Sequence, residues 1–296
     1  MIDKAATRVE SLVFRDGAFT RSHRAVPAEV AVAISIGGST HAVMMATPAE
    51  LEDMAIGLVL NERIVDRLEE IEHLDIVETE AGIDCQVRLV EVRARTYVAR
   101  RRQMTGPVGC GLCGVESLEL AAPDLPNVGG VLAGAIAPEA IVAAVADMAR
   151  QQDLSRLTRA VHAAAFHMAG GGTDRGLVVT REDVGRHNAL DKVAGHLARA
   201  GIEPRDGFLT ITSRVSVELI QKAARMGCGL IAAVSAPTAL AIAEAKAAGI
   251  TLVAVVRGAE FEVFSHPGRI LGADDLVALG DDEEEQLIEG RAVHGT

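Results

Sequence analysis

The chain has 296 residues, a formal net charge of −12, and a composition in which 49% of residues are hydrophobic but only 2% are aromatic. A chain of this length can bury a well-filled core, so its folding requires no disulfide or structural metal. With no Trp and one Tyr, the chain lacks the aromatic surface on which single-stranded nucleic acid stacks, and its negative charge would repel a phosphate backbone. We therefore expect no nucleic-acid partner.

The sequence also carries no signal for secretion or membrane insertion. Its first residues contain charges but no apolar signal core, and no later stretch reaches the roughly 18 uninterrupted apolar residues of a membrane span. Four cysteines in a chain this long do not form the framework of a secreted disulfide-rich domain. We expect a cytoplasmic protein with reduced thiols and no membrane partner.

The sequence pattern predicts that the first part of the chain is an α+β unit. Alternating apolar residues and short apolar runs predict four strands, at 29–35, 41–46, 74–78 and 85–92. The first two strands form a hairpin around Gly37 and Gly38. A helix is predicted from Thr47-Pro48 through Asn61, because apolar residues recur there at helical spacing and glutamates occupy its first turn.

A basic run and a glycine-rich segment follow these strands. Five arginines lie between residues 93 and 102, and the segment 106–114 contains too much glycine for a regular element, so it is interpreted as a loop. Prolines and glycines are frequent again at 121–137, which predicts a domain boundary there. The expected domains are therefore 1–135 and 136–296.

Strands and helices alternate at short intervals in the second domain. The strands are expected at 160–166, 176–180, 208–212, 230–234 and 251–256. The helices are expected at 138–150, 186–200, 215–226 and 237–248. This alternation predicts a layered α/β sheet with helices on its faces.

The chemistry of the chain is expected to centre on Cys110 and Cys113. Two cysteines at this spacing serve zinc binding, dithiol exchange or sulfur transfer, and the spacing alone does not choose among them. A structural zinc site needs about four ligands, and the sequence offers no second Cys or His pair, so zinc is disfavoured. Backbone amides of the glycine loop and the nearby arginines favour a reactive thiolate. The alternative is that both are inert core thiols.

The sequence lacks the motif that nucleobase deaminases require. That chemistry requires a glutamate two residues after the zinc-binding His or Cys, and a Cys pair later in the chain. His162 is followed by Ala163 and Ala164, and the cysteine pair precedes the histidine. Deaminase activity is therefore rejected, whether or not the fold is related.

Seven motifs in order along most of the chain resemble the formate dehydrogenase accessory sulfurtransferases, the FdhD family. They are ATP at 46–48 with GLVLNE at 57–62, CGLCG at 110–114, VHAA at 161–164, REDVGRHNALDK at 181–192, RVSVE at 214–218, SAPT at 235–238 and FSHPGR at 264–269. Any one of these motifs would be weak evidence. Their order and number make the resemblance strong.

The resemblance implies a sulfur carrier. Members of this family accept sulfur from a cysteine desulfurase as a cysteine persulfide, and deliver it to the molybdenum cofactor, bis(molybdopterin guanine dinucleotide), of formate dehydrogenase. Cys110 matches the position that carries the persulfide, and Cys113 would assist or resolve it. The expected partners are the desulfurase, the catalytic subunit of formate dehydrogenase and a second copy of the chain in a homodimer.

The resemblance also implies a fold and a cofactor site. The second domain would have a layered α/β/α fold similar to cytidine deaminase, and the smaller first domain would carry the cysteine loop. The cofactor would bind to the segment that follows the last sheet strand, which comprises Val255, Val256, Arg257, Gly258, Ala259 and Glu260. Of these, Arg257 is the residue whose guanidinium can fork onto phosphate.

Helix N-termini offer further candidate contacts to the cofactor. Arg186 and His187 begin one predicted helix, while Ser235 and Thr238 precede another, and free amides at such ends bind nucleotide phosphates. The alternative for Ser235 and Thr238 is that they only cap the helix, and His187 is alternatively an interior histidine.

Two other functions remain open from the sequence. One is a cofactor chaperone that holds the molybdenum nucleotide without sulfur chemistry, and the other is a thiol-disulfide oxidoreductase that uses both cysteines of the loop.

Overall fold

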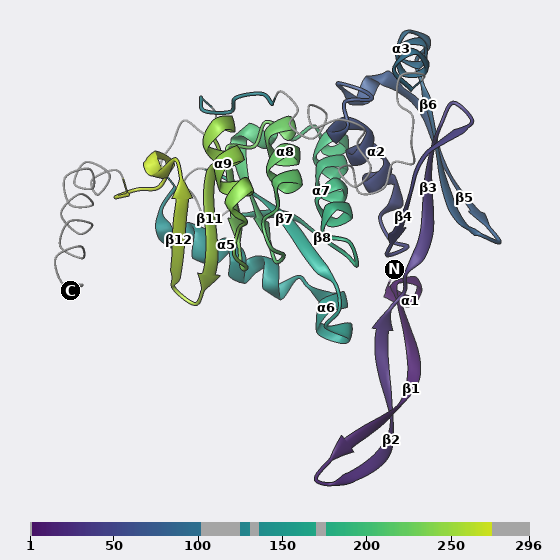
Figure 1. Cartoon of the computed structure of the whole chain (residues 1–296), viewed down its shortest axis with the longest axis vertical. Helices are drawn as coiled ribbons and strands as arrows, with labels where there is room; N and C mark the ends of the chain where they lie inside the picture. The colour runs from purple at the N-terminus through teal and green to yellow at the C-terminus, as the bar shows by residue number, and fades with distance from the viewer. Residues whose placement is uncertain (1, 102–124, 131–135, 170–175, 274–296) are drawn as a thin grey trace, which may run out of the picture.

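The computed structural model describes residues 2–101, 125–130, 136–169 and 176–273, and these form a mixed α/β protein, as expected (Figure 1). The described strands form three sheets of two, four and six strands. In the described residues, no helix is long and apolar enough to cross a membrane. The glycine-rich segment predicted as a loop lies outside the described residues, and the domain boundary predicted at 121–137 remains a prediction.

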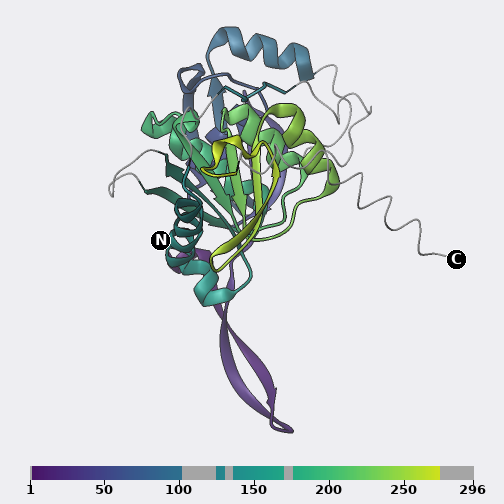
Figure 2. The ribbon, with the colours of Figure 1, turned by 90° about the vertical axis from the view of Figure 1, so that its left-hand side faces the viewer.

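A long hairpin, which was not predicted from the sequence, follows the short helix α1 (Ile2–Ala5). Strands β1 (Ala6–Arg15) and β2 (Ala18–Pro27) pair antiparallel along their full length. Asp16 and Gly17 connect them, both with positive φ, as in the tight turns that match the twist of a hairpin. The hairpin projects away from the rest of the molecule in both views (Figures 1 and 2).

The four-stranded sheet has the order β4-β3-β6-β5 and contains the predicted hairpin of β3 (Val30–Ile36) and β4 (Ser39–Ala46). The other two strands are β5 (Ile71–Thr79) and β6 (Gly82–Leu89), and β6 runs parallel to β3. A short 3-10 turn, η1 (Leu68–Glu70), precedes β5. Helix α2 (Leu51–Asn61) packs its apolar side on one face of this sheet.

Four boundaries in this part were predicted wrongly, and two of them are the starts of β5 and β6, which each lie three residues earlier than expected. Helix α2 begins at Leu51 and not at Thr47-Pro48, because the backbone amide and the hydroxyl of Thr47 are both hydrogen-bonded to the segment around Asp183 and Glu50 adopts a left-handed conformation with φ of 47°. Strand β6 ends at Leu89, three residues before its predicted end, and helix α3 (Glu91–Arg101) follows. The arginine run therefore lies largely on a helix, whose Tyr97 is buried in the core.

The six-stranded sheet has the order β12-β11-β10-β9-β7-β8. Its strands are β7 (His162–Met168), β8 (Leu177–Asp183), β9 (Gly207–Ile211), β10 (Leu230–Ala233), β11 (Thr251–Arg257) and β12 (Glu260–Ser265). Strands β9, β10 and β11 are parallel, while β7 and β12 are antiparallel to their neighbours. The five predicted strands are present within a few residues, and β12 was not predicted.

Helices cover both faces of this sheet. On one face lie α7 (Arg186–Ala200), α8 (Val217–Met226) and α9 (Ala239–Ala248), and on the other lies α5 (Pro138–Arg150), as Figure 1 shows. The short elements α6 (Asp153–Thr158), η2 (Pro204–Asp206) and η3 (Pro267–Arg269) complete the described chain. Helices α5 and α7 have the predicted bounds, and α8 and α9 each begin two residues later than predicted.

Helices α2 and α7 join the two larger sheets and cross at two glycines. A Cβ placed on Gly57 would lie 1.8 Å from the backbone oxygen of Asp191, and one on Gly195 would lie 1.9 Å from the backbone oxygen of Asp53. Only glycine permits the two helix backbones to approach this closely. The four-stranded and six-stranded sheets are therefore held together by a tight helix pair, visible side by side in Figure 1.

Candidate functional site

The cysteine pair predicted to carry the chemistry, Cys110 and Cys113, lies outside the described residues. The two cysteines that the structure describes, Cys85 and Cys228, are both completely buried. Burial raises the pKa of Cys85 to about 12 and that of Cys228 to about 11, so both are protonated thiols at neutral pH. Neither has the exposed thiolate that nucleophilic sulfur chemistry needs.

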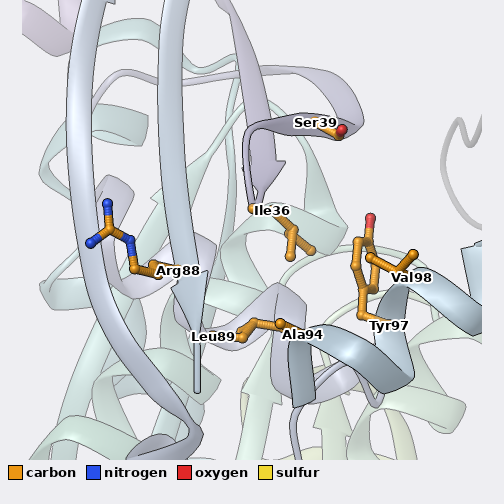
Figure 3. Close-up of a pocket in the computed structure, with 8 residues that line it drawn as sticks. Ile36, Ser39, Arg88, Leu89, Ala94, Tyr97 and Val98 are labelled. Atoms are coloured by element: carbon orange, nitrogen blue, oxygen red, sulfur yellow. The ribbon is translucent and has the colours of Figure 1, made fainter. Parts of the chain in front are cut away.

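A cavity of about 370 Å³ lies beside α3, the helix that leads into the cysteine segment. Ile36, Leu89 and Ala94 converge with the Tyr97 ring on it, whereas the Arg88 guanidinium points away from them (Figure 3). The Tyr97 hydroxyl lies 3.0 Å from the Nδ1 of His41, whose Nε2 lies 2.7 Å from Glu62. This polar chain fixes the aromatic wall of an otherwise apolar cavity.

The described candidates for cofactor binding lie along one edge of the six-stranded sheet. Because β8, β9, β10 and β11 all run in the same direction, the segments after them emerge at the same edge. Arg186 follows β8, Ser235 follows β10, and Arg257 ends β11. Ligands of open α/β sheets bind at this carboxyl edge of the strands. The sequence-predicted residues are thus placed along a common edge.

The edge is long. Four strand-to-strand steps separate β8 from β11 in the sheet order, and neighbouring strands lie about 4.8 Å apart, so Arg186 and Arg257 lie about 19 Å apart along the edge. The two arginines are therefore too far apart to bind the same phosphate group. Their separation suits an extended ligand with two anionic parts.

The segment from Val255 to Glu260 differs from its prediction. It does not follow the last strand: Val255, Val256 and Arg257 belong to β11, Gly258 and Ala259 form a turn, and Glu260 begins β12 opposite Arg257. The prediction ended the sheet one strand early and overlooked the alternation of Phe261 and Val263 with Glu260 and Glu262, which is itself a strand signal. Arg257 and the turn are exposed at the sheet edge.

Val255 has a strained backbone. Its φ is +55°, in the left-handed region that β-branched residues avoid, and the register of β11 with β12 shifts at this point. Its amide donates to the carbonyl oxygen of Ser235 over 3.3 Å, so the strained residue is hydrogen-bonded to the loop after β10. Strain of this kind costs about 1–3 kcal/mol and concentrates at functional sites. The distortion lies within the segment predicted to contact the cofactor.

Arg186 and His187 form the other end of the site, where α7 begins. Burial, followed by the charges of Lys222 and Arg186, lowers the pKa of His187 to about 4, so this ring is neutral at pH 7. Burial and Arg186 also lower the pKa of His162, which starts β7 opposite Asp183. The Nε of Arg186 and the Nε2 of His187 are buried and have no hydrogen-bond partner among the described residues. A ligand oxygen or nitrogen could satisfy both.

Two charged residues of this cluster, Glu218 and Lys222 on α8, were not predicted from the sequence. Burial would raise the pKa of Glu218, but hydrogen bonds and the charges of His187 and Arg186 hold it below its ordinary value. Lys222 donates to both carboxylate oxygens of Asp191, over 2.7 and 2.8 Å. The signal was their spacing of four residues, which places both on one side of the first turns of α8.

Thr238 caps helix α9, as its alternative interpretation predicted. Its hydroxyl accepts from the backbone amide of Ala241 over 3.2 Å, and its amide donates to the carbonyl oxygen of Val215. The Ser235 carbonyl accepts from Val255, as described above. The capping contact accounts for Thr238 without a ligand, and a role in phosphate binding for either residue remains a prediction.

The motif at 181–192 anchors the site to the first half of the chain. Lys192 is fully buried and its Nζ lies 2.7 Å from Asp183, which accepts from the Thr47 amide over 3.0 Å. The Asn188 side chain donates both to Asp183 and to the Met45 carbonyl, each over 2.9 Å. A buried ion pair needs such additional hydrogen bonds to offset desolvation. The network fixes the start of α7, and with it Arg186 and His187.

Comparison with solved structures identifies the fold, and comparison with protein families then identifies the family. The fold matches a solved structure described as a putative formate dehydrogenase accessory protein from Desulfotalea psychrophila, with a TM-score of 0.69 over 90% of this chain and 100% of that one, at 24% sequence identity. The chain has the fold of that mixed α/β protein. It belongs to the FdhD/NarQ family, whose model matches residues 27–271, so the resemblance noted in the sequence is confirmed.

Relatives with much higher identity support the same assignment. The sulfur carrier protein FdhD of Agrobacterium fabrum is 50% identical over 270 residues, which cover 91% of this chain and 98% of that protein. The sulfur carrier protein FdhD of Brucella abortus is 49% identical over 268 residues, which cover 90% of this chain and 98% of that protein.

Proposed function

We propose that this protein is a sulfur carrier for formate dehydrogenase, with Cys110 holding the sulfur as a persulfide. The observation that carries the proposal is the 50% identity, over nearly the whole of both chains, with a protein named as a sulfur carrier. The buried, protonated state of Cys85 and Cys228 supports it, because it leaves Cys110 and Cys113 as the thiols available for exchange.

The proposed chemistry begins with a cysteine desulfurase. The Cys110 thiolate attacks the outer sulfur of the donor's persulfide, a new S–S bond forms on Cys110, and the donor cysteine leaves as a thiolate. Release of that outer sulfur as sulfide requires two electrons. Cys113 supplies them if its thiolate attacks the inner sulfur, which forms a Cys110–Cys113 disulfide and expels sulfide toward the acceptor.

The acceptor in this proposal is bis(molybdopterin guanine dinucleotide), bound as cargo at the carboxyl edge of a deaminase-like layered domain. Its phosphates would meet Arg257 and the strained Val255–Glu260 segment at one end, and Arg186 and His187 at the other. The buried, unpartnered Nε of Arg186 and Nε2 of His187 fit such a group, because both lack a hydrogen-bond partner within the described residues. The protein would act in the cytoplasm as a homodimer.

Intact mass spectrometry tests the sulfur step. The protein is incubated with a cysteine desulfurase and cysteine, and its mass is measured before and after reductant, alongside the Cys110→Ala and Cys113→Ala variants. We expect a reductant-labile gain of one sulfur that Cys110→Ala abolishes and Cys113→Ala retains. If Cys110→Ala gains the same sulfur as the wild type, the assignment of the persulfide to Cys110 is wrong.

The strained edge of the sheet favours one alternative, a chaperone that holds the cofactor without sulfur chemistry. The two functions separate in a formate dehydrogenase activation assay. A sulfur carrier loses activation with Cys110→Ala, whereas a chaperone keeps it and loses activation with Arg257→Ala. A thiol-disulfide oxidoreductase would instead reduce insulin disulfides and require both loop cysteines.

A further inference from the structure

The tip of the β1–β2 hairpin exposes large apolar side chains. Leu12, Phe14 and Phe19 are 67%, 62% and 70% exposed, and the two phenylalanine rings contact each other at a tilt of 51°, with centroids 5.0 Å apart. The whole chain has only six phenylalanines, one tyrosine and no tryptophan, so two of its seven aromatic side chains lie at this tip. Exposed apolar groups gathered in this way mark an interaction surface.

The strand register places these side chains on one face of the hairpin. Phe14 pairs with Phe19 and Leu12 pairs with Arg21, so the apolar tip continues into a basic side chain on the same face. The described contacts of the hairpin with the body lie near its base, where Arg24 on the opposite face donates to the Thr158 carbonyl over 3.3 Å. The apolar face is thus left open.

An isolated two-stranded ribbon is at best marginally stable in water, so ten-residue strands of this kind need a covering partner whenever the protein is folded. A client that visits only during turnover does not meet that need. A second copy of the same chain is present wherever the chain is present. This requirement favours a homotypic partner.

The distribution of charge along the chain also favours a homotypic partner. Residues 6–27 contain four arginines and two acidic residues, a formal charge of +2, which leaves −14 for the rest of a chain whose total is −12. A basic and apolar arm is complementary to an acidic body. The arm also lies almost entirely before residue 27, where the match to the family model begins.

The four-stranded sheet offers a matching surface. Its outer face, opposite α2, carries Val43 and Met45 on the edge strand β4, 55% and 49% exposed. The registers of β4, β3, β6 and β5 place Asp84 and the exposed Val77 on the same face as Val43. Exposed apolar side chains and the acidic Asp84 therefore share this face, with Arg88 two pleats further along β6, and the apolar part suits the apolar tip of the arm.

We propose that the β1–β2 arm of one copy packs on the outer face of the four-stranded sheet of a second copy, and that the reciprocal contact closes a two-fold symmetric dimer. This inference rests on the homodimer in the proposed function and specifies its interface. It concerns surfaces far in sequence from Cys110, so sulfur loading is measured independently of it.

Light scattering coupled to size-exclusion chromatography tests the arm. The combined variant Leu12→Ser, Phe14→Ser and Phe19→Ser should weaken dimerisation by at least about tenfold, because interface energy concentrates in such anchors. Leu240→Ser, which changes a leucine that is 60% exposed on α9, should leave the dimer unchanged. Circular dichroism establishes that each variant is folded.

The receiving surface has its own variant, Val43→Ser with Met45→Ser, which should weaken the dimer to a similar degree and keeps the test decisive if the arm variant fails to fold. A dimer that survives both sets of substitutions would overturn the interface and leave the homodimer standing. A monomeric wild type would overturn both. A monomeric wild type that co-sediments with anionic phospholipid vesicles would assign the arm to a lipid surface instead.

Discussion

The Nζ of Lys192 lies 2.7 Å from a carboxylate oxygen of Asp183, and neither side chain is accessible to solvent. The same carboxylate holds the Thr47 amide and the Asn188 side chain, so one ion pair connects the start of α7 to the segment before α2. The pair is therefore the centre of the junction between the two halves of the chain.

Replacing Lys192 with Met should lower the free energy of unfolding by about 3–5 kcal/mol, because it leaves the buried Asp183 carboxylate without its counter-ion. Urea denaturation measures the loss. The matched surface change is Arg205→Met, which breaks a pair with Glu203 in which both side chains are more than 60% exposed. This control should change stability by less than about 1 kcal/mol, and a similar loss in both variants would contradict the role of the buried pair.

Adding one methyl group at the helix crossing should be more damaging than its size suggests. In Gly57→Ala the new Cβ would meet the Asp191 backbone oxygen at 1.8 Å, so α2 and α7 must separate. We expect a loss of at least about 3 kcal/mol, at the upper end for overpacked cores, since backbone atoms cannot rotate away. Gly176→Ala, where the Cβ would meet nothing within 4 Å, provides the control in thermal unfolding.

Two adjacent valines of β11 should respond differently to glycine. Val256→Gly should cost about 3 kcal/mol, because it empties a buried position and loosens an extended backbone. Val255→Gly should cost at least about 1 kcal/mol less, because it also relieves the left-handed φ of +55°. Equal losses in denaturant titrations of the two variants would show that Val255 stores no strain.

His167 should make stability depend on pH. Burial lowers its pKa to about 4, whereas an unfolded histidine titrates near 6.5, so the unfolded chain binds this proton first as the pH falls. The contribution of His167 is complete above about pH 6.5 and is lost as the pH drops toward 4. Between pH 7 and pH 5 the loss is roughly 2 kcal/mol.

The variant His167→Gln tests this by removing the titrating ring while keeping a polar group beside Thr210, whose hydroxyl lies 2.9 Å from the His167 Nε2. Its melting temperature should fall less than that of the wild type between pH 7 and pH 5. His73→Gln changes an exposed histidine and should follow the wild type. An unchanged pH dependence in His167→Gln would rule out this assignment.

Periodicity was enough to predict the elements that bury a regular stripe. Helices α5 and α7 have the predicted bounds because their apolar residues recur at helical spacing and Pro138 starts the first of them. The β1–β2 arm was missed although Asp16-Gly17 is a strong hairpin signal, because its alternating residues bury no face within the chain. Helix α3 was missed because five arginines obscured the spacing of Ala94 and Tyr97.

Only part of the candidate site could be predicted from the sequence, because the rest depends on contacts between elements. Arg186 and His187 were predicted from their place at the start of a helix, and the 255–260 segment was predicted from the resemblance. The strand order of the sheet then shows that both lie along one sheet edge. The pairing of Asp191 with Lys222, or of Lys192 with Asp183, depends on how α2, α7 and α8 meet, and sequence spacing carries no information about contacts between elements. The left-handed φ of Val255 likewise has no local signal, since nothing in the residue type favours it.

The glycine crossing of α2 and α7 bears on how members of the family can be recombined. Gly57 lies in one half of the chain and Gly195 in the other, and each lies directly against the backbone of the other helix. A chimera that joins the first half of this chain to the second half of a relative will assemble only if the relative keeps a small residue at the crossing and the acids and lysines that surround it. Inheritance of the two halves as one piece is the expected outcome.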